Sequence, residues 1–329
     1  MKILLVREDG LGDALVCAPL VAALAAAGHV VGAVLGTRNA DAFAAHVFAH
    51  VHVLDRIPWP AHGATPESRA RALAEVRAAA YDVALVATEE LSAYEFVRDC
   101  GIGARVGFVN GASKPLKSLR VRTMLTRAIV RSASARRTHA HEVETLFSLG
   151  ADFVTEHAPT RDVVRLRPLV IGDHPVLDEC ERAVAPIAVQ VSQKFAQVGL
   201  DRDAFVACAR ALRVRGDDVL VLGDDDAFVR EIARASDART LGACDLAVWK
   251  LQIATARALV TGDSGAAHVA GMTGVATVDA FAPSAATAYD VRRWAPWAAP
   301  HRAIVLDPAG DAVATARVLV TALDELLAA

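Results

Sequence analysis

Residues 258–271 read ALVTGDSGAAHVAG: an apolar run, then a loop of small and polar residues, then an alanine-rich helical segment. The run over 258–261 predicts a buried strand, and residues 266–272 predict a helix that packs closely against it. A strand that leads through a short loop into a helix is typical of an open parallel sheet, in which ligands bind at the carboxyl ends of the strands. This stretch therefore predicts an α/β protein with a ligand-binding loop.

The composition of this loop suits an anion. Gly265 and Ala266 leave room for a pyrophosphate, which backbone N–H groups and the dipole of the following helix would stabilise. Ser264 adds a hydroxyl donor, and His268 lies one turn into the helix. The alternative is a purely structural turn in which Asp263 or Ser264 caps the helix.

A second loop of the same kind opens the chain, where residues 1–14 read MKILLVREDGLGDA. The apolar run 3–6 predicts a strand, and Asp13 stands at or beside the N-cap of the next predicted helix. The two glycines allow a tight turn and a close approach of the backbone to a ligand. A dinucleotide-binding GxGxxG loop needs a third glycine where Leu15 stands, which disfavours a hydride-transferring enzyme. A cap without any role in chemistry remains the alternative for Asp13.

The same alternation of strands and helices runs through both halves of the chain and implies parallel sheets with right-handed crossovers. Strands are predicted at residues 3–6, 30–35, 52–54, 83–87, 106–108, 187–191, 218–222, 258–261 and 276–281. Helices are predicted at residues 14–27, 40–49, 66–80, 92–100, 141–149, 202–213, 227–235, 247–256, 266–272 and 312–327.

The length of 329 residues fits two domains. Regular periodicity weakens between Pro159 and Pro186 and then resumes. We therefore predict an N-terminal domain at 1–165, a linker at 166–185 and a C-terminal domain at 186–329. The predicted fold class is α/β, with two Rossmann-like domains whose parallel sheets face a central cleft.

Two further loops in the second half follow predicted strands. Lys194 stands just past the strand that opens the C-terminal domain, where its ammonium group could pair with a phosphate. A solvated surface lysine is an equal alternative. Asp225 lies in a run of three aspartates, and its carboxylate could accept hydrogen bonds from ribose hydroxyls. The alternative is that these acids only form a turn and stabilise the start of the next helix.

Composition excludes several other classes of protein. A net charge of −3 does not indicate a nucleic-acid binder, and no apolar window of about 18 residues predicts a membrane-spanning helix. Five scattered cysteines without a CxxC spacing look like small core residues of a reduced compartment, so we expect a cytoplasmic protein. These are Cys17, Cys100, Cys180, Cys208 and Cys244.

A group of three histidines invites a metal-site hypothesis. His46 and His50 could share a face of a predicted helix, but His52 falls in the following strand. Asp41 and Asp55 flank the group without completing a recognised ligand spacing. We therefore predict no metal site.

Together, the four loops resemble glycosyltransferase family 9, the ADP-heptose lipopolysaccharide heptosyltransferases. Leu11-Gly12-Asp13, with Pro19 six residues on, resembles the opening motif of the family. Residues 261–268, TGDSGAAH, resemble its most characteristic motif, and residues 101–108 and 141–150 resemble weaker landmarks. The resemblance covers most of the chain.

The resemblance implies a GT-B fold and an inverting, metal-independent transfer that needs no cofactor, because the ADP-sugar is a donor substrate. Asp13 would be the general base for the acceptor hydroxyl. Helix-start amides after Asp263, with Ser264 and Lys194, would stabilise the departing diphosphate. Asp225 would bind the ribose, and His268 would complete the phosphate-side contacts. The predicted donor-binding residues are Ser192, Lys194, Asp225, Asp263, Ser264, Gly265, Ala266 and His268.

The family resemblance also implies that the acceptor binds mainly to the N-terminal domain. Residues 114–137 contain eight basic residues and no acidic one, and they would face an acidic lipid-linked saccharide. A solvated helix face is the alternative, and a peripheral contact with the inner membrane would fit the same charges. The predicted acceptor-binding residues are Gly10, Leu11, Gly12, Lys114, Lys117 and Arg120.

Two motifs depart from the family pattern. Lys194 is followed by FAQVG where the family carries Trp-Pro, and the family's Phe-Gly-Pro is Phe281-Ala282-Pro283. These departures affect the identity of the sugar more than the reaction class. Two other functions stay open from the sequence: a non-catalytic nucleotide-sugar-binding protein of the same fold, and a Rossmann-type NAD-linked oxidoreductase or epimerase.

Overall fold

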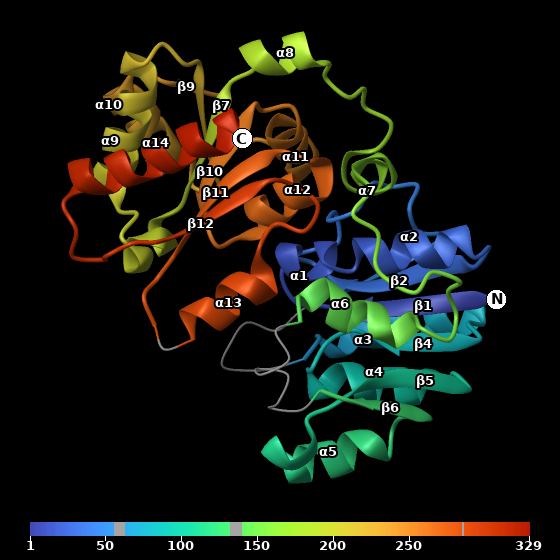
Figure 1. The fold of residues 1–329 in the computed structure, drawn as a ribbon. Helices are drawn as coiled ribbons and strands as arrows, with labels where there is room; N and C mark the ends of the chain where they lie inside the picture. The colour runs from blue at the N-terminus through green and yellow to red at the C-terminus, as the bar shows by residue number, and fades with distance from the viewer. Residues whose placement is uncertain (56–62, 132–139, 285) are drawn as a thin grey trace. The chain divides into compact units, whose positions relative to one another are not determined.

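The computed structural model describes residues 1–55, 63–131, 140–284 and 286–329 (Figure 1). The chain forms two compact units, Met1–Arg161 and Asp162–Ala329. Each unit is built on one six-stranded sheet in which the paired strands run parallel. The predicted α/β class with two parallel sheets is thereby confirmed.

The first sheet has the strand order β3-β2-β1-β4-β5-β6. Its strands are β1 (Lys2–Arg7), β2 (Val30–Gly36), β3 (Val51–Leu54), β4 (Val83–Val86), β5 (Ala104–Val109) and β6 (Arg127–Val130). The helices of this unit are α1 (Leu11–Leu15), α2 (Ala18–Ala26), α3 (Pro66–Ala79), α4 (Leu91–Cys100), α5 (Pro115–Arg122) and α6 (Glu142–Phe147), with short 3₁₀ turns η1 (Gly111–Ser113) and η3 (Ser148–Gly150).

The second sheet has the order β12-β11-β10-β7-β8-β9. Its strands are β7 (Ile187–Val191), β8 (Val219–Gly223), β9 (Arg239–Thr240), β10 (Ala258–Gly262), β11 (Ala276–Phe281) and β12 (His301–Val305). Its helices are α7 (Val163–Ile171), α8 (Glu179–Val184), α9 (Arg202–Val214), α10 (Asp226–Ser236), α11 (Leu246–Ala254), α12 (Gly265–Thr273), α13 (Thr287–Trp294) and α14 (Ala312–Ala328), with a 3₁₀ turn η4 (Gln193–Val198).

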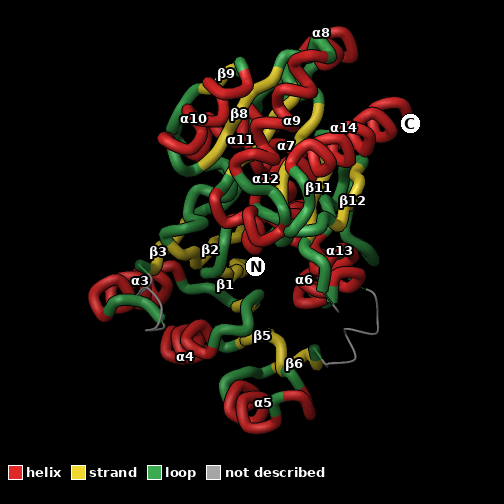
Figure 2. Tube along the Cα trace, turned by 90° about the vertical axis from the view of Figure 1, so that its left-hand side faces the viewer, coloured by secondary structure: helices red, strands yellow, loops and turns green. Residues whose placement is uncertain are grey.

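The central strands are buried on both faces because helices cover both sides of each sheet (Figure 2). In the second unit α9, α10 and α14 pack together, and α7, α11 and α12 form a separate packed group. Val189, Val260 and Val278 on three neighbouring strands join Phe205 of α9 and Leu319 of α14 in one apolar core. Continuous apolar runs are the expected sequence of such doubly covered parallel strands.

Both sheets share one topology when each is read from its own first strand. The orders are β3-β2-β1-β4-β5-β6 and β9-β8-β7-β10-β11-β12. In each sheet the chain adds two strands on one side of its first strand and then crosses to the other side. The switch point therefore lies between β1 and β4 in the first sheet and between β7 and β10 in the second. Ligands of such sheets bind at the carboxyl ends of the two strands that flank this switch point. The loops that follow these four strands are therefore the first places to look for a functional site.

Several predicted elements differ in the structure. The predicted helix 40–49 is wrong: this segment forms turns, because Asn39 bonds to the backbone and the rings of Phe43 and Phe48 pack edge to face at 4.9 Å in the interior. The predicted helix 14–27 is two helices, α1 and α2, with Pro19 in the first turn of the second. Elements α5, β6, α13 and β12 had no counterpart in the prediction.

The predicted linker 166–185 also differs, because residues 163–171 and 179–184 form α7 and α8 within the second unit. The buried Arg167 of α7 donates a 2.9 Å hydrogen bond to the carbonyl of Ala254, which joins α7 to α11. Among the cysteines, Cys180 is exposed rather than a core residue, and Cys244 is half-buried. No helix in the described part of the chain is both long and apolar enough to cross a membrane.

Candidate active site

All the predicted donor-binding residues of the second unit except Asp225 follow the two strands that flank its switch point. Ser192 and Lys194 follow β7, and Asp263 and Ser264 follow the neighbouring strand β10. Lys194 and Asp263 line one pocket of about 390 Å³, a size in the range of small-molecule sites. The ammonium group of Lys194 lies 5.1 Å from the centre of the Phe195 ring. The structure therefore brings together a cation and a carboxylate that the sequence separates by almost 70 residues.

The start of α12 has the features expected of an anion site. Ser264 occupies the N-cap position, but its side chain makes no capping hydrogen bond and instead lies 3.1 Å from the hydroxyl of Thr261. Ser264 therefore holds the N-cap position of α12 without a capping hydrogen bond from its hydroxyl, and the predicted role of this turn in anion binding stays a prediction. Gly265 and Ala266 begin the helix, and a Cβ atom at Gly262 would lie only 2.8 Å from the Phe195 ring, so the strand end needs a glycine. His268 is buried one turn further on.

Asp225 serves as a helix cap. One of its carboxylate oxygens accepts a 3.1 Å hydrogen bond from the N–H of Phe228, and the other accepts a 2.8 Å bond from the side chain of Gln193. Asp225 thus caps α10, and the bond to Gln193 links it to the loop that carries Lys194; its predicted contact with a ribose stays a prediction. Asp225 is not among the residues that line the pocket.

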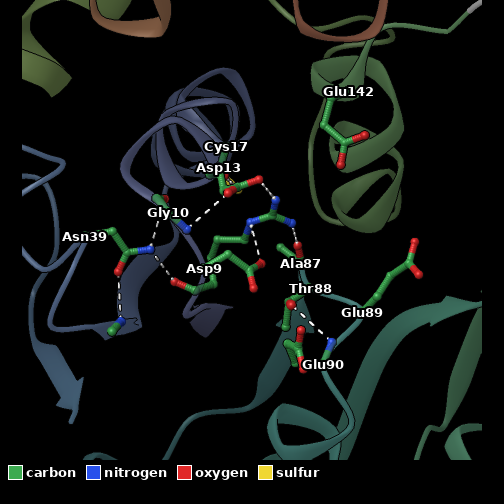
Figure 3. A network of polar contacts seen from close by, with 12 residues as sticks. Asp9, Gly10, Asp13, Cys17, Asn39, Ala87, Thr88, Glu89, Glu90 and Glu142 are labelled. Atoms are coloured by element: carbon green, nitrogen blue, oxygen red, sulfur yellow. Dashed lines mark hydrogen bonds and ion pairs between the residues drawn. The ribbon is translucent and has the colours of Figure 1, made fainter. Parts of the chain in front are cut away.

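In the first unit, the half-buried Asp13 belongs to a polar network around the buried Arg7 at the end of β1 (Figure 3). Arg7 donates from Nη2 to Oδ1 of Asp13 at 2.7 Å, and the N–H of Gly10 donates to Oδ2 at 3.0 Å. Asp13 is therefore the third residue of α1 rather than its N-cap, a position held by Gly10. Leu11 and Gly12 form the first turn of that helix. Both oxygens of the Asp13 carboxylate are held in a fixed orientation.

Arg7 connects this network to the neighbouring strand. Its Nη1 donates to the carbonyl of Ala87 after β4, and its Nε lies 3.2 Å from Oδ2 of Asp9. Burial alone would lower the pKa of the guanidinium, but Asp9, Cys17 and Asp13 outweigh this effect and raise it. Arg7 therefore stays charged and can keep two carboxylates in place.

Two neighbours of Asp13 have raised pKa values. Burial raises the pKa of Asp9, and the charge of Arg7 opposes this only in part. Burial also raises the pKa of the Cys17 thiol to about 12. A thiol of that kind is not a nucleophile at neutral pH, so Asp13 is the better candidate for chemistry in this network.

The basic stretch divides into two groups. Burial alone would raise the pKa of Glu89, but a hydrogen bond from Asn110 and the charge of Arg131 lower it, with smaller effects from Lys117 and Lys114. Figure 3 draws Glu89 with no contact to Asp13; its partners are Asn110 and Arg131. Arg120, in contrast, forms an ion pair with Glu95 of α4. Of the predicted basic residues, Arg136 and Arg137 lie outside the described residues.

The three histidines do not gather around one point. His52 bonds to Glu75 and to the hydroxyl of Tyr81, each at 3.1 Å. Within the described ranges, no group of three or more His, Cys, Asp or Glu side chains could hold a metal ion. The expectation of a metal-free reaction stays a prediction.

Comparison with known proteins identifies the family of the chain. The sequence matches the sequence model of glycosyltransferase family 9 (heptosyltransferase) over residues 69–312. The chain belongs to glycosyltransferase family 9. It is therefore an enzyme, a heptosyltransferase-type glycosyltransferase, and the predicted resemblance is confirmed. Comparison with curated protein sequences gave no match.

Solved structures of this family share the fold. The E. coli heptosyltransferase WaaC with ADP superposes with a TM-score of 0.75 at 16% identity, over 99% of this chain and 100% of that one. The same enzyme with ADP-2-deoxy-2-fluoro heptose gives 0.74 at 16% identity, over 99% of both chains. E. coli ADP-heptose lps heptosyltransferase II gives 0.70 at 19% identity, over 100% of this chain and 99% of that one. The predicted GT-B type fold, with two Rossmann-like domains, is thereby confirmed.

Several residues of this glycosyltransferase site were not predicted. They include Arg7 and the buried Asn39, whose amide donates to the carbonyl of Arg7 at 3.0 Å and so fixes the loop after β1. They also include the residues of α13 that line the pocket, Thr287, Asp290 and Trp294. The charge of Arg7 after a strand was a usable signal, but nothing in the sequence pairs α13 with Lys194.

Proposed function

We propose that this glycosyltransferase moves a heptose from ADP-heptose to an acidic, lipid-linked saccharide of the lipopolysaccharide inner core. The transfer inverts the anomeric centre and uses neither a metal nor a cofactor. The observation that carries the proposal is the pocket at the second switch point, which Lys194 and Asp263 line together. That E. coli WaaC is known with ADP and with ADP-2-deoxy-2-fluoro heptose supports the choice of donor.

The second unit is proposed to hold the donor and stabilise its departing half. The bond between the anomeric carbon and the diphosphate oxygen breaks, and its electron pair leaves with ADP. Lys194, which lines the pocket, and the amides at the start of α12 would stabilise that charge, which is the task a metal ion performs in other transferases. Gly265 and Ala266 allow the close approach of the diphosphate, and Ser192 and His268 complete its surroundings.

The first unit is proposed to activate the acceptor. A hydroxyl of the acceptor gives its proton to Asp13 while its oxygen attacks the anomeric carbon from the side opposite ADP, so the configuration inverts. The two hydrogen bonds from Arg7 and Gly10 leave further lone pairs on the Asp13 oxygens for that proton. The loop Gly10–Gly12 and the lysines beside Glu89 would contact the acceptor.

The fixed orientation of Asp13 leads to a prediction for Arg7. A lysine ammonium cannot reproduce the fork with which Arg7 holds Asp13, Asp9 and the carbonyl of Ala87, so Arg7→Lys should let the Asp13 carboxylate turn away. We expect kcat to fall by about tenfold, with the ADP affinity unchanged. Steady-state rates and ADP titrations measure the two effects.

Arg105→Lys is the matched control for Arg7→Lys. Arg105 also donates to backbone carbonyls of the first unit, those of Met124 and Ile102, but it does not contact Asp13. Arg105→Lys should leave kcat unchanged. An Arg7→Lys enzyme that turns over at the rate of the wild type would show that Arg7 does not position Asp13.

Helix α5 supports the proposed acceptor and a peripheral contact with the inner membrane from the cytoplasm. Leu116 and Leu119 are 83% and 65% exposed on a helix that also carries Lys117 and Arg120. Exposed leucines among basic residues suit the boundary between anionic headgroups and acyl chains. This charge pattern also fits a saccharide that carries phosphate or carboxylate groups.

A nucleotide panel tests the proposed donor. The thermal midpoint of the protein is measured with ADP, UDP, GDP and NAD at equal concentrations. ADP is expected to give the largest rise, because a ligand at 100 times its Kd stabilises the folded state by about 2.7 kcal/mol. Incubation with ADP-heptose and delipidated core saccharides, followed by mass spectrometry, should then show the heptosylated product. Stabilisation by NAD alone would overturn the proposed donor.

A further inference from the structure

The pocket of the second unit has two chemically different sides. Lys194 and Asp263 line it from the ends of β7 and β10, and α13 lines it with Thr287, Asp290 and Trp294. Of the described residues that line the pocket, Lys194 is the only basic one. One pocket thus offers a cation for a phosphate near the strand ends and a different set of groups on α13.

Asp290 and Trp294 both line the pocket from α13. They are four residues apart on α13, so their side chains share one face of the helix. The ring of Trp294 packs edge to face against His268 of α12, with 6.0 Å between the ring centres, and the guanidinium of Arg293 lies 4.6 Å from the Trp294 ring centre. These contacts hold the indole in place at the pocket wall.

The chemistry of this pair suits a polyhydroxylated ligand better than a phosphate. A carboxylate accepts hydrogen bonds and donates none, so Asp290 pairs with hydroxyl groups and repels phosphate oxygens. An indole ring supplies an apolar surface of fixed shape against which the C–H face of a sugar ring can pack.

We propose that Asp290 and Trp294 of α13 form the subsite for the sugar of the donor and determine which sugar the enzyme accepts. This inference rests on the proposed function, in which Lys194 holds the diphosphate. Asp290 accepts hydrogen bonds from the hydroxyls of the donor sugar, and Trp294 packs against its ring. The nucleotide itself needs neither residue.

Calorimetric titration of the whole enzyme with ADP and with ADP-heptose tests the subsite. For Asp290→Ala we expect the Kd of ADP-heptose to rise about tenfold, which is typical for lost hydrogen bonds to a charged group, while the Kd of ADP stays within twofold. Asp290→Asn keeps the size of the side chain and is the second variant in case the alanine variant folds poorly. It should raise the Kd of ADP-heptose less than Asp290→Ala does, again with the Kd of ADP within twofold. Glu325→Ala, an exposed acid on α14, is the control.

Comparing the affinity for ADP with that for ADP-heptose distinguishes the possible outcomes. A loss for ADP-heptose alone supports the subsite. An equal loss for both ligands, or no loss for either, overturns it while leaving the proposed donor intact. A wild-type enzyme that binds neither ligand would overturn the proposed function, and the subsite with it.

Discussion

Replacing Asp13 with asparagine is expected to slow sugar transfer by about 10²- to 10⁴-fold, the usual effect of removing a general base. The amide keeps the shape of the carboxylate but cannot accept the proton of the acceptor hydroxyl. The polar network supports this choice of base, because Arg7 and Gly10 hold the two carboxylate oxygens in position. The rate is measured as product formation by mass spectrometry at saturating donor.

Two further measurements make the Asp13 experiment specific. ADP affinity should not change, because Asp13 belongs to the first unit and the pocket with Lys194 lies in the second. Glu67→Gln, which changes an exposed acid on α3, should leave the rate of transfer unchanged. If Asp13→Asn transfers sugar as fast as the wild type, the base lies elsewhere and the proposed mechanism is wrong.

The strands that carry the site could be predicted because they are buried on both faces. Strands β1, β4, β7 and β10 are short apolar runs that end at polar or glycine-rich loops. This pattern can be recognised in a single sequence without knowing which strands pair. The residues that follow them, such as Asp13, Lys194 and Asp263, could therefore be selected from the sequence.

The elements that were not predicted correctly depend on tertiary contacts that a single sequence does not show. Residues 40–49 have a helical composition, but Phe43 and Phe48 gain more from burial against the first unit than from a surface helix. Helix α13 follows a proline-containing loop and carries mixed polar residues, so its periodicity is weak. Strand β12 has exposed and half-buried positions, as an edge strand does, and lacks a clear apolar run.

The partners of the candidate site residues were equally hidden. Arg7 and Ala87 meet because β1 and β4 are neighbours at the switch point, 80 residues apart in sequence. Asp290 reaches the pocket because β11 leads α13 back to the ends of β7 and β10. Strand order decides such pairings, and a single sequence gives the order only through the general topology of the fold.

Asp279 of β11 is a buried carboxyl whose cost to stability can be measured. Its neighbours Val278 and Ala280 point into the core shared with α14, so its side chain points to the other face of the sheet, and its two oxygens have no hydrogen-bond partner among the described residues. Burial holds the pKa of Asp279 well above its usual range, and the charge of Asp263 raises it further. The folded protein therefore binds this proton more tightly than the unfolded chain does.

The stability of the protein depends on pH through the proton of Asp279. Below a pH of about 4, Asp279 is protonated in both states, and its burial does not oppose folding through charge. As the pH rises, the unfolded chain loses the proton first, so the free energy of unfolding falls by up to about 1.4 kcal/mol per pH unit until the pKa of the folded state is passed. Asp279→Asn removes this term, because the amide has no proton to lose.

We therefore expect Asp279→Asn to be more stable than the wild type at neutral pH, by an amount that grows as the pH rises above about 4. Each kcal/mol corresponds to about 2–4 °C in Tm for a domain of this size. Thermal unfolding at several pH values measures the difference, and Asp173→Asn, at an exposed position of the same unit, should give a curve parallel to the wild type. Parallel curves for Asp279→Asn would mean that this carboxyl titrates alike in both states, and that the core around β11 admits water or a partner for it.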